Sequence, residues 1–260
     1  MLSECIPTLT RGRMLMASCL AAAAVTAGCT GDRPELVADR DCPDRPPAVY
    51  AALDVSDSGR SPALVAERLA ALDHLLTDTA VCRGHAKVVA FTGSAAATDV
   101  LLDRDLEAAG ATRRSQLRKV PGLVAGAMDD VRGGLDVAAE HLPSGGTDVL
   151  AQMGLAREFH GQIGADRPLQ VVVWSDGIAS SPVDLNRADL DVATAGVLVS
   201  QVGVVDLSGT DVTFAGVGRP AGALPPTAFV DALKAFYQGA CERSGATCTV
   251  VSDASVASSR

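Results

Sequence analysis

The chain has 260 residues, of which 48% are hydrophobic and 20% are charged, with a formal net charge of −9 and a pI near 4.9. This length fits one domain of about 200 residues with its own core, together with a processed segment. No basic stripe is present that could neutralise a phosphate backbone, so nucleic-acid binding is excluded as a function class.

The N-terminal segment has the pattern of an export signal. Arg11 and Arg13 precede an apolar run at residues 14–25, and small residues lead from there to Cys29. The run is shorter than the roughly 20 apolar residues that span a bilayer, so it predicts a cleaved signal. Residues 26–29 resemble the lipobox of bacterial lipoproteins, whose cysteine is lipidated and becomes the first residue of the mature chain.

Three details of the N-terminal segment leave open the type of signal, its cleavage site and the first residue of the protein. Thr26 stands where a lipobox usually has Leu or another aliphatic residue, and an ordinary secretory signal would also export the domain. Cys19 is a second candidate for the cut, although little apolar sequence precedes it. Met14 is an alternative start to Met1.

We therefore expect a signal peptide at residues 1–28, a polar tether at 29–47 and a folded domain at 48–260. The expected location is outside the cell membrane, with Cys29 lipid-anchored to its outer face. In a cell with two membranes, the protein would be periplasmic or attached to the outer membrane. The lipid anchor is the only membrane contact that this pattern predicts.

Apolar runs alternate with helical patterns along the rest of the chain. Strands are expected at residues 49–55, 87–92, 169–175, 212–217 and 247–251, and a short hairpin strand near 100–106. Helices are expected at residues 62–79, about 123–141 and about 148–162, and another opens at Pro225-Pro226. Ser61 is a good N-cap for the first helix. This alternation predicts an α/β fold with a mostly parallel sheet and helices on both faces.

Oxygen-bearing side chains follow two of the predicted strands and one glycine loop. Asp54-x-Ser56-x-Ser58 ends the first strand, Thr147 follows Gly-Gly, and Asp176 follows the strand at 169–175. Because the carboxyl ends of parallel strands meet at one edge of a sheet, we expect these side chains to converge there. Two carboxylates and three hydroxyls suit a hard cation such as Mg²⁺.

These three pieces, in this order, resemble the metal-ion-dependent adhesion site (MIDAS) of von Willebrand factor type A (VWA) domains. The resemblance covers roughly residues 48–251 and implies a three-layer, doubly wound, Rossmann-like fold. It implies that Ser56 and Ser58 bind the cation directly, and Thr147 directly or through water. Asp54 and Asp176 would hold coordinating waters. Mg²⁺ is the expected cofactor, with Mn²⁺ or Ca²⁺ as alternatives.

The spacing between Ser58 and Thr147 is long for this pattern, which leaves Thr92 and Thr98 as rivals to Thr147. Gly145-Gly146 and the helix expected after Thr147 favour Thr147. Asp57 also departs from the neutral residue that is commoner at its position.

Four cysteines remain after Cys29, and an even number in an exported domain predicts two disulfides with three possible connectivities. They are Cys42, Cys82, Cys241 and Cys248. Their spacing is not that of a zinc site. On a VWA-like fold all four fall at the edge opposite the metal, which makes the pairs Cys42–Cys82 and Cys241–Cys248 plausible.

The resemblance implies binding and not catalysis, with an acidic side chain of an unidentified partner protein completing the cation's coordination. Such a module would serve adhesion or envelope assembly. Two alternatives come from other classes. Asp54 after an apolar strand is similar to the nucleophile of haloacid-dehalogenase-type phosphatases, but Ser56 replaces the second Asp that they require. A solute-binding lipoprotein would need a two-lobed cleft, which one domain does not predict.

Overall fold

The computed structural model describes residues 41–143 and 145–254, and the predicted signal peptide and Cys29 lie outside them. The strands are β1 (Ala48–Asp54), β2 (His85–Phe91), β3 (Thr98–Asp105), β4 (Leu169–Trp174), β5 (Asp211–Ala215) and β6 (Thr247–Val251). The helices are η1 (Asp57–Gly59), α1 (Pro62–Val81), α2 (Arg113–Leu117), α3 (Val120–His141), α4 (Ala151–Ile163), α5 (Val192–Gln201) and α6 (Thr227–Arg243). None of the helices within the described ranges is long and apolar enough to cross a membrane.

The six strands form one sheet in the order β3-β2-β1-β4-β5-β6, and all neighbours pair in parallel except β2 and β3. β1 therefore lies inside the sheet with a parallel partner on each side. Strands buried on both faces are expected to be continuously apolar, and every residue of β1 is buried.

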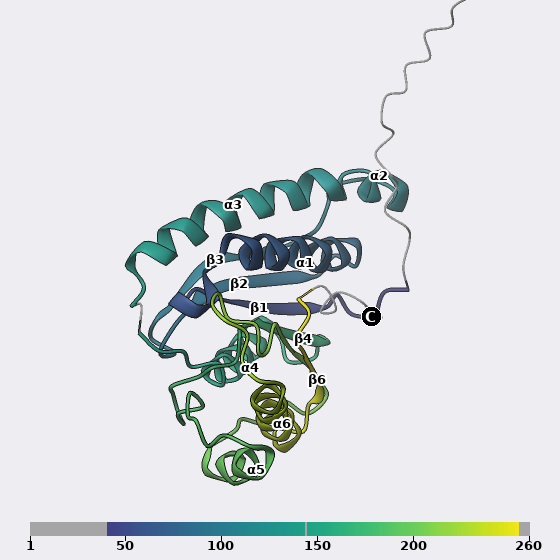
Figure 1. Cartoon of the computed structure of the whole chain (residues 1–260). Helices are drawn as coiled ribbons and strands as arrows, with labels where there is room; N and C mark the ends of the chain where they lie inside the picture. Colours follow the sequence, from purple (N-terminus) through teal and green to yellow (C-terminus); the bar gives the residue numbers. More distant parts are fainter. Residues whose placement is uncertain (1–40, 144, 255–260) are drawn as a thin grey trace, which may run out of the picture. The chain divides into compact units, whose positions relative to one another are not determined.

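Alternate residues of β1 face two separate apolar layers. Ala51 and Leu53 pack into one layer with α1 and α3, while Tyr50 and Ala52 pack into the other with α4, α5 and α6. Figure 1 shows these two groups of helices on opposite sides of the sheet. The predicted three-layer, mostly parallel α/β fold is confirmed.

Three helices were missed by the sequence prediction: η1, α2 and α5. α5 is rich in Val, Ala and Gly, and its helical start depends on the Asp191 side chain, which accepts a hydrogen bond from the Thr194 amide at 2.7 Å. α2 is a single short turn capped by Thr112. The predicted start of the helix at about 148–162 was also wrong, because α4 begins at Ala151 and not at Asp148. The Asp148 carboxylate instead accepts from the Ala151 amide at 3.0 Å.

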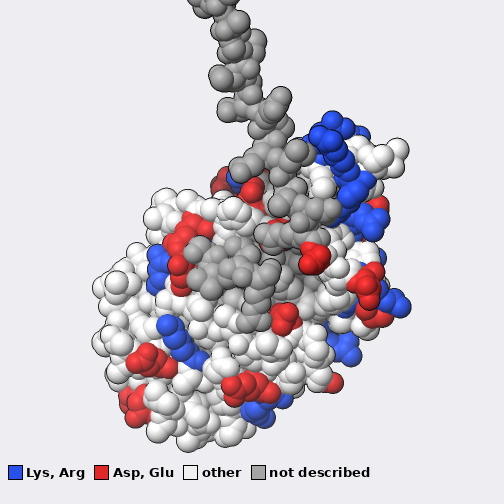
Figure 2. All heavy atoms as spheres, turned by 90° about the vertical axis from the view of Figure 1, so that its right-hand side faces the viewer, with Lys and Arg blue, Asp and Glu red and all other residues white. Residues whose placement is uncertain are grey.

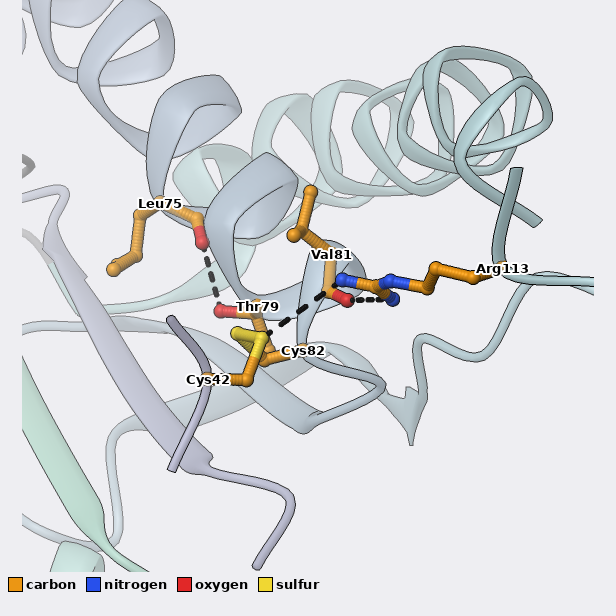
Figure 3. Close-up of a disulfide and its surroundings, with 6 residues drawn as sticks. All are labelled: Cys42, Leu75, Thr79, Val81, Cys82 and Arg113. Atoms are coloured by element: carbon orange, nitrogen blue, oxygen red, sulfur yellow. Dashed lines mark hydrogen bonds between the residues drawn. A yellow bond between two sulfur atoms is a disulfide. The ribbon is translucent and has the colours of Figure 1, made fainter. Parts of the chain in front are cut away.

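Both predicted disulfides are present. Cys42 pairs with Cys82 at a Cα–Cα distance of 5.4 Å, and Cys241 pairs with Cys248 at 6.0 Å. The first bond ties the end of the tether to the end of α1, and the guanidinium of Arg113 reaches the carbonyl of Val81 beside it (Figure 3). Residues 41–47 of the predicted tether are therefore fastened to the domain.

Candidate functional site

The candidate site lies at the carboxyl ends of β1 and β4, where the strand order changes direction. From β1 the chain moves through α1 to β2 on one side, whereas β4 lies on the other side of β1. A parallel sheet binds ligands at such a switch point, because the loops leaving the two strands diverge there. Asp54 is the last residue of β1 and Asp176 lies two residues after β4, so both predicted carboxylates are at this point.

Asp54 is held by the backbone and by the neighbouring strand. It is only 2% exposed, and its Oδ1 accepts a hydrogen bond from the Ser56 amide at 2.8 Å. Its Oδ2 accepts from the Ser175 hydroxyl at 2.6 Å. Because Leu53 pairs with Trp174 in the parallel register, Ser175 stands opposite Asp54. The Ser175 hydroxyl in turn accepts from the Gly177 amide at 3.0 Å, so it links the two loops.

The hydroxyls of Ser56 and Ser58 lie together in the turn that follows β1. Their Oγ atoms are 3.4 Å apart, which places two neutral hydroxyl oxygens side by side in the turn after Asp54. The Ser58 carbonyl accepts from the Ala221 amide at 2.7 Å, and this bond fastens the turn to the loop between β5 and α6. The Asp-x-Ser-x-Ser segment thus presents its side-chain oxygens from a fixed backbone.

Thr147 lies at the same edge of the sheet. Its carbonyl accepts from the Ser180 amide at 3.1 Å, in the loop after β4, while the next amide, of Asp148, donates to the Thr92 carbonyl at 3.1 Å, after β2. Since β1 lies between β2 and β4, the glycine loop crosses the end of β1. Thr147 is 2% exposed.

The two rivals to Thr147 differ in their surroundings. Thr92 is 1% exposed, and among the described residues its hydroxyl has no hydrogen-bond partner. Thr98, at the start of β3, accepts a long hydrogen bond of 3.5 Å from Gln152. Thr92 is therefore the stronger rival, since its free hydroxyl lies next to the loop that carries Thr147.

Burial and like charge dominate the electrostatics of the site. Burial raises the pKa of Asp54, and the negative charge of Asp176 raises it further, while hydrogen bonds from Ser175 and Ser56 and the charge of Arg68 act in the opposite direction. Asp176 is 0% exposed; its Oδ1 accepts from the Ile178 amide at 2.9 Å. Two carboxylates at close quarters in a buried site favour a bound cation.

Arg68 supplies a buried positive charge behind the site. It is 4% exposed, and its Nη1 donates to the carbonyls of Asp54 at 2.9 Å and Gly59 at 3.1 Å. Burial lowers the pKa of its guanidinium, and the charges of Asp54 and Asp176 raise it in part. Arg68 therefore both closes the turn after β1 and offsets some of the charge of the two carboxylates.

α6 contributes a second support through Tyr237. The buried phenol donates to the Gly177 carbonyl at 2.9 Å. Burial raises the pKa of Tyr237 well above its ordinary value, and the negative charges of Asp176, Asp54 and Asp148 add to this rise. Gly177 has φ +75°, and a Cβ there would lie 2.8 Å from the Tyr237 ring, so glycine permits this contact.

The donor set fits a hard divalent cation. Within the described residues, the Oδ2 of Asp176 is buried and has no hydrogen-bond partner, and no group of three His, Cys, Asp or Glu side chains is placed to hold a metal. An unpartnered buried carboxylate oxygen is costly unless a cation or water meets it. The available ligands are therefore carboxylate and hydroxyl oxygens, which Mg²⁺ prefers.

Ser175 and Arg68 belong to the site but were not singled out from the sequence. Ser175 immediately precedes Asp176, yet its link to Asp54 depends on the β1–β4 register. Arg68 did carry a signal, because it is a charge within the buried stripe of α1, four residues before Leu72. Trp174, the last residue of β4, is a core residue at 0% exposure and does not belong to the site.

Gly146 gives a direct test of the glycine loop. It has φ +81°, and a Cβ would lie 2.4 Å from the Ser180 Oγ, which accepts from the Thr147 amide at 3.1 Å. We expect Gly146→Ala to lower the free energy of unfolding by about 1–2 kcal/mol, measured by urea denaturation. Gly145→Ala is the matched control, because a Cβ there meets nothing within 4 Å. It should change the free energy by less than about 0.5 kcal/mol; equal losses in both variants would contradict this account of the loop.

No protein-family model and no curated protein matches the sequence. Solved structures align with most of this chain at low sequence identity. An aerotolerance-related membrane protein from Bacteroides fragilis shares 19% identity, over 82% of this chain and 94% of that protein, with a TM-score of 0.44. BatB from Bacteroides thetaiotaomicron shares 15% sequence identity, over 79% of this chain and 90% of that protein, with a TM-score of 0.46. A von Willebrand factor type A structure from Catenulispora acidiphila shares 13% sequence identity, over 82% of this chain and 40% of that protein, with a TM-score of 0.34. These likenesses are weak, and the three-layer, mostly parallel α/β fold of the domain is shown by its own sheet order and its two apolar layers.

Proposed function

We propose that this chain is an exported, lipid-anchored protein-binding module that depends on a divalent cation. The cation site comprises Asp54, Ser56, Ser58, Thr147 and Asp176. The observation that carries the proposal is the pairing of two buried carboxylates, one with an unpartnered oxygen, beside two adjacent serine hydroxyls. When bound, a divalent cation supplies a positive centre that accepts a carboxylate oxygen from a partner protein.

The residues of the site have distinct roles in this proposal. Ser56 and Ser58 offer hydroxyl oxygens as direct ligands, and Thr147 offers a third, directly or through water. Asp54 and Asp176 balance the positive charge and hold coordinating waters. Mg²⁺ is the proposed cation, because the site contains only oxygen donors.

Binding is favoured over catalysis by the state of Asp54. A phosphohydrolase of the kind considered above needs Asp54 as a nucleophile. Both of its carboxylate oxygens are already hydrogen-bonded, to Ser56 and Ser175, and the side chain is 2% exposed. The solute-binding alternative has no support, since the described residues build a single sheet with one helix layer on each face.

Export is supported by the two disulfides, because disulfides persist in oxidising compartments outside the cytosol. Anchoring at Cys29 remains a proposal with its own test. Cys29→Ala should move the protein from the membrane fraction to the soluble fraction of the cell, and unchanged membrane association would refute the anchor.

Thermal unfolding of the mature chain tests the cation site. After EDTA treatment, Mg²⁺ at about 100 times its dissociation constant should stabilise the domain by roughly 2.7 kcal/mol. For a domain of this size that raises the unfolding midpoint by roughly 5–10 °C. The rise should be absent in Asp54→Ala, and Thr147→Ala should reduce it more than Thr92→Ala. A midpoint that ignores Mg²⁺ in the unmodified chain would contradict the proposal.

A further inference from the structure

A cluster of exposed cations surrounds α2, at the edge of the sheet opposite the candidate metal site. We call Arg83, Arg114, Arg118 and Lys119 the basic cluster; all four side chains are exposed. Figure 2 shows Lys and Arg side chains gathered near the top of the described part, at the height where Figure 1 places α2. The net charge of the whole chain, −9, conceals this local excess of positive charge.

Contacts around the first disulfide bring the basic cluster together. Arg113 of α2 donates to the carbonyl of Val81 at 2.6 Å, which places α2 beside the end of α1 and the adjoining Arg83. A pocket of about 410 Å³ lies between them, and its lining includes Cys42, Asp44, Cys82, Arg83, Arg113 and Gln116. Leu117 is buried and fixes α2 against the core, while Arg114 and Arg118 remain in solvent.

The basic cluster lacks the acidic partners that most other cations of the domain have. Ion pairs within the described ranges include Arg104–Asp130, Arg132–Asp129, Arg187–Asp189 and Arg219–Glu67. Among residues 41–143 and 145–254, no ion pair joins any member of the basic cluster to a carboxylate. Neighbouring cations that form no ion pair repel one another, so the cluster favours an anionic partner.

The attachment point of the tether favours a membrane surface as that partner. Cys42 is bonded to Cys82 beside the basic cluster, and Cys29 precedes Cys42 by 13 positions. At 3.3–3.6 Å per residue, a lipid at Cys29 can be at most about 45 Å from this disulfide. The disulfide therefore fixes the tether, at Cys42, to the end of the domain that carries the basic cluster. The carboxyl end of β1, with Asp54, belongs to the opposite end.

The distance from the membrane also determines which charges of the domain interact with an anionic surface. The Debye length is about 8 Å in physiological salt, so only the face next to the membrane interacts strongly with it. The negative charges on other faces are screened, and the chain's overall acidity does not prevent binding through one basic face. We propose that Arg83, Arg114, Arg118 and Lys119 bind the headgroups of anionic lipids in the membrane that carries the anchor. The metal edge of the sheet then faces away from the membrane, toward a partner protein.

The proposed lipid contact rests on the anchor proposed at Cys29, but it can be tested without that anchor. A chain that begins at Thr30 contains the whole core, because both apolar layers consist of residues 48–254. Its sedimentation with vesicles of phosphatidylcholine, with and without phosphatidylglycerol, measures the contact. We expect binding only to the vesicles that contain phosphatidylglycerol. Raising the salt from 0.1 M to 1 M should abolish it, since the Debye length falls from about 10 Å to about 3 Å.

A charge-matched pair of variants makes the test specific. Each basic residue near an anionic surface contributes about fivefold in affinity, so R114Q/R118Q/K119Q should weaken binding by roughly a hundredfold. R132Q/R157Q/R187Q removes the same charge from exposed sites outside the cluster and should bind like the unmodified chain. Equal binding by the two variants, or no binding by the unmodified chain, would overturn the proposal. Asp176→Ala should leave vesicle binding unchanged, which separates this contact from the metal site.

Discussion

Replacing Arg68 with methionine should lower the free energy of unfolding of the metal-free domain by about 3–5 kcal/mol. Arg68 is buried beside the turn after β1, and it donates to the carbonyls of Asp54 and Gly59. Methionine fills much of the same space but leaves both carbonyls without their donor. It also leaves Asp54 and Asp176 without the nearby positive charge. Urea denaturation in EDTA measures the loss.

A bound cation should offset part of this loss, because it supplies positive charge to the same two carboxylates. The Arg68→Met variant is therefore expected to gain more stability from Mg²⁺ than the unmodified chain does. Arg219→Met is the matched control: its half-exposed guanidinium pairs with Glu67 at 2.7 Å, and such pairs contribute at most about 1 kcal/mol. A loss in Arg68→Met no larger than that in Arg219→Met would contradict this role for Arg68.

The second large effect is expected from Asp54→Asn, which should act in opposite directions with and without a cation. Asparagine keeps the side-chain shape and an oxygen acceptor for the Ser56 amide, but it removes the charge that Asp176 repels. Without metal at neutral pH the variant should be more stable than the unmodified chain. With Mg²⁺ at about 100 times the dissociation constant of the unmodified chain, the variant should lack the gain of roughly 2.7 kcal/mol.

The pH dependence follows from the raised pKa of Asp54. A carboxyl with a higher pKa in the folded than in the unfolded state contributes stability below its unfolded pKa, and this contribution is lost as the pH rises through the folded pKa. The advantage of Asp54→Asn in EDTA should therefore be smallest in acid and grow toward neutral pH. Urea denaturation across this range measures it; an advantage that is largest in acid would contradict the assignment.

Much of the fold could be predicted because its signals are local. The apolar strands, the Ser61 cap and the alternation of strands and helices are patterns of neighbouring residues. The Asp-x-Ser-x-Ser turn and Asp176 could be placed together because parallel strands end at a common edge. The disulfide pairs then followed from the order of the elements and are present as expected.

Other features depend on register and on long-range packing. The bond from Ser175 to Asp54 requires the pairing of Leu53 with Trp174, which no local pattern specifies. Arg68 was visible as a charge in an apolar stripe, but its partners are carbonyls that only the folded turn presents. The basic cluster was hidden because net charge averages over the whole chain, whereas its members come from two separate segments brought together beside the first disulfide.

Titration of the metal-free chain with Mn²⁺, monitored through the electron paramagnetic resonance signal of free Mn²⁺, tests the cation site most directly. We predict a single bound Mn²⁺ per chain that Mg²⁺ displaces. Binding should be lost in Asp176→Ala and kept in Asp57→Ala, which removes an exposed carboxylate from the same turn as Ser56 and Ser58. No bound Mn²⁺ in the unmodified chain, or equal binding by both variants, would contradict a cation site at this edge of the sheet.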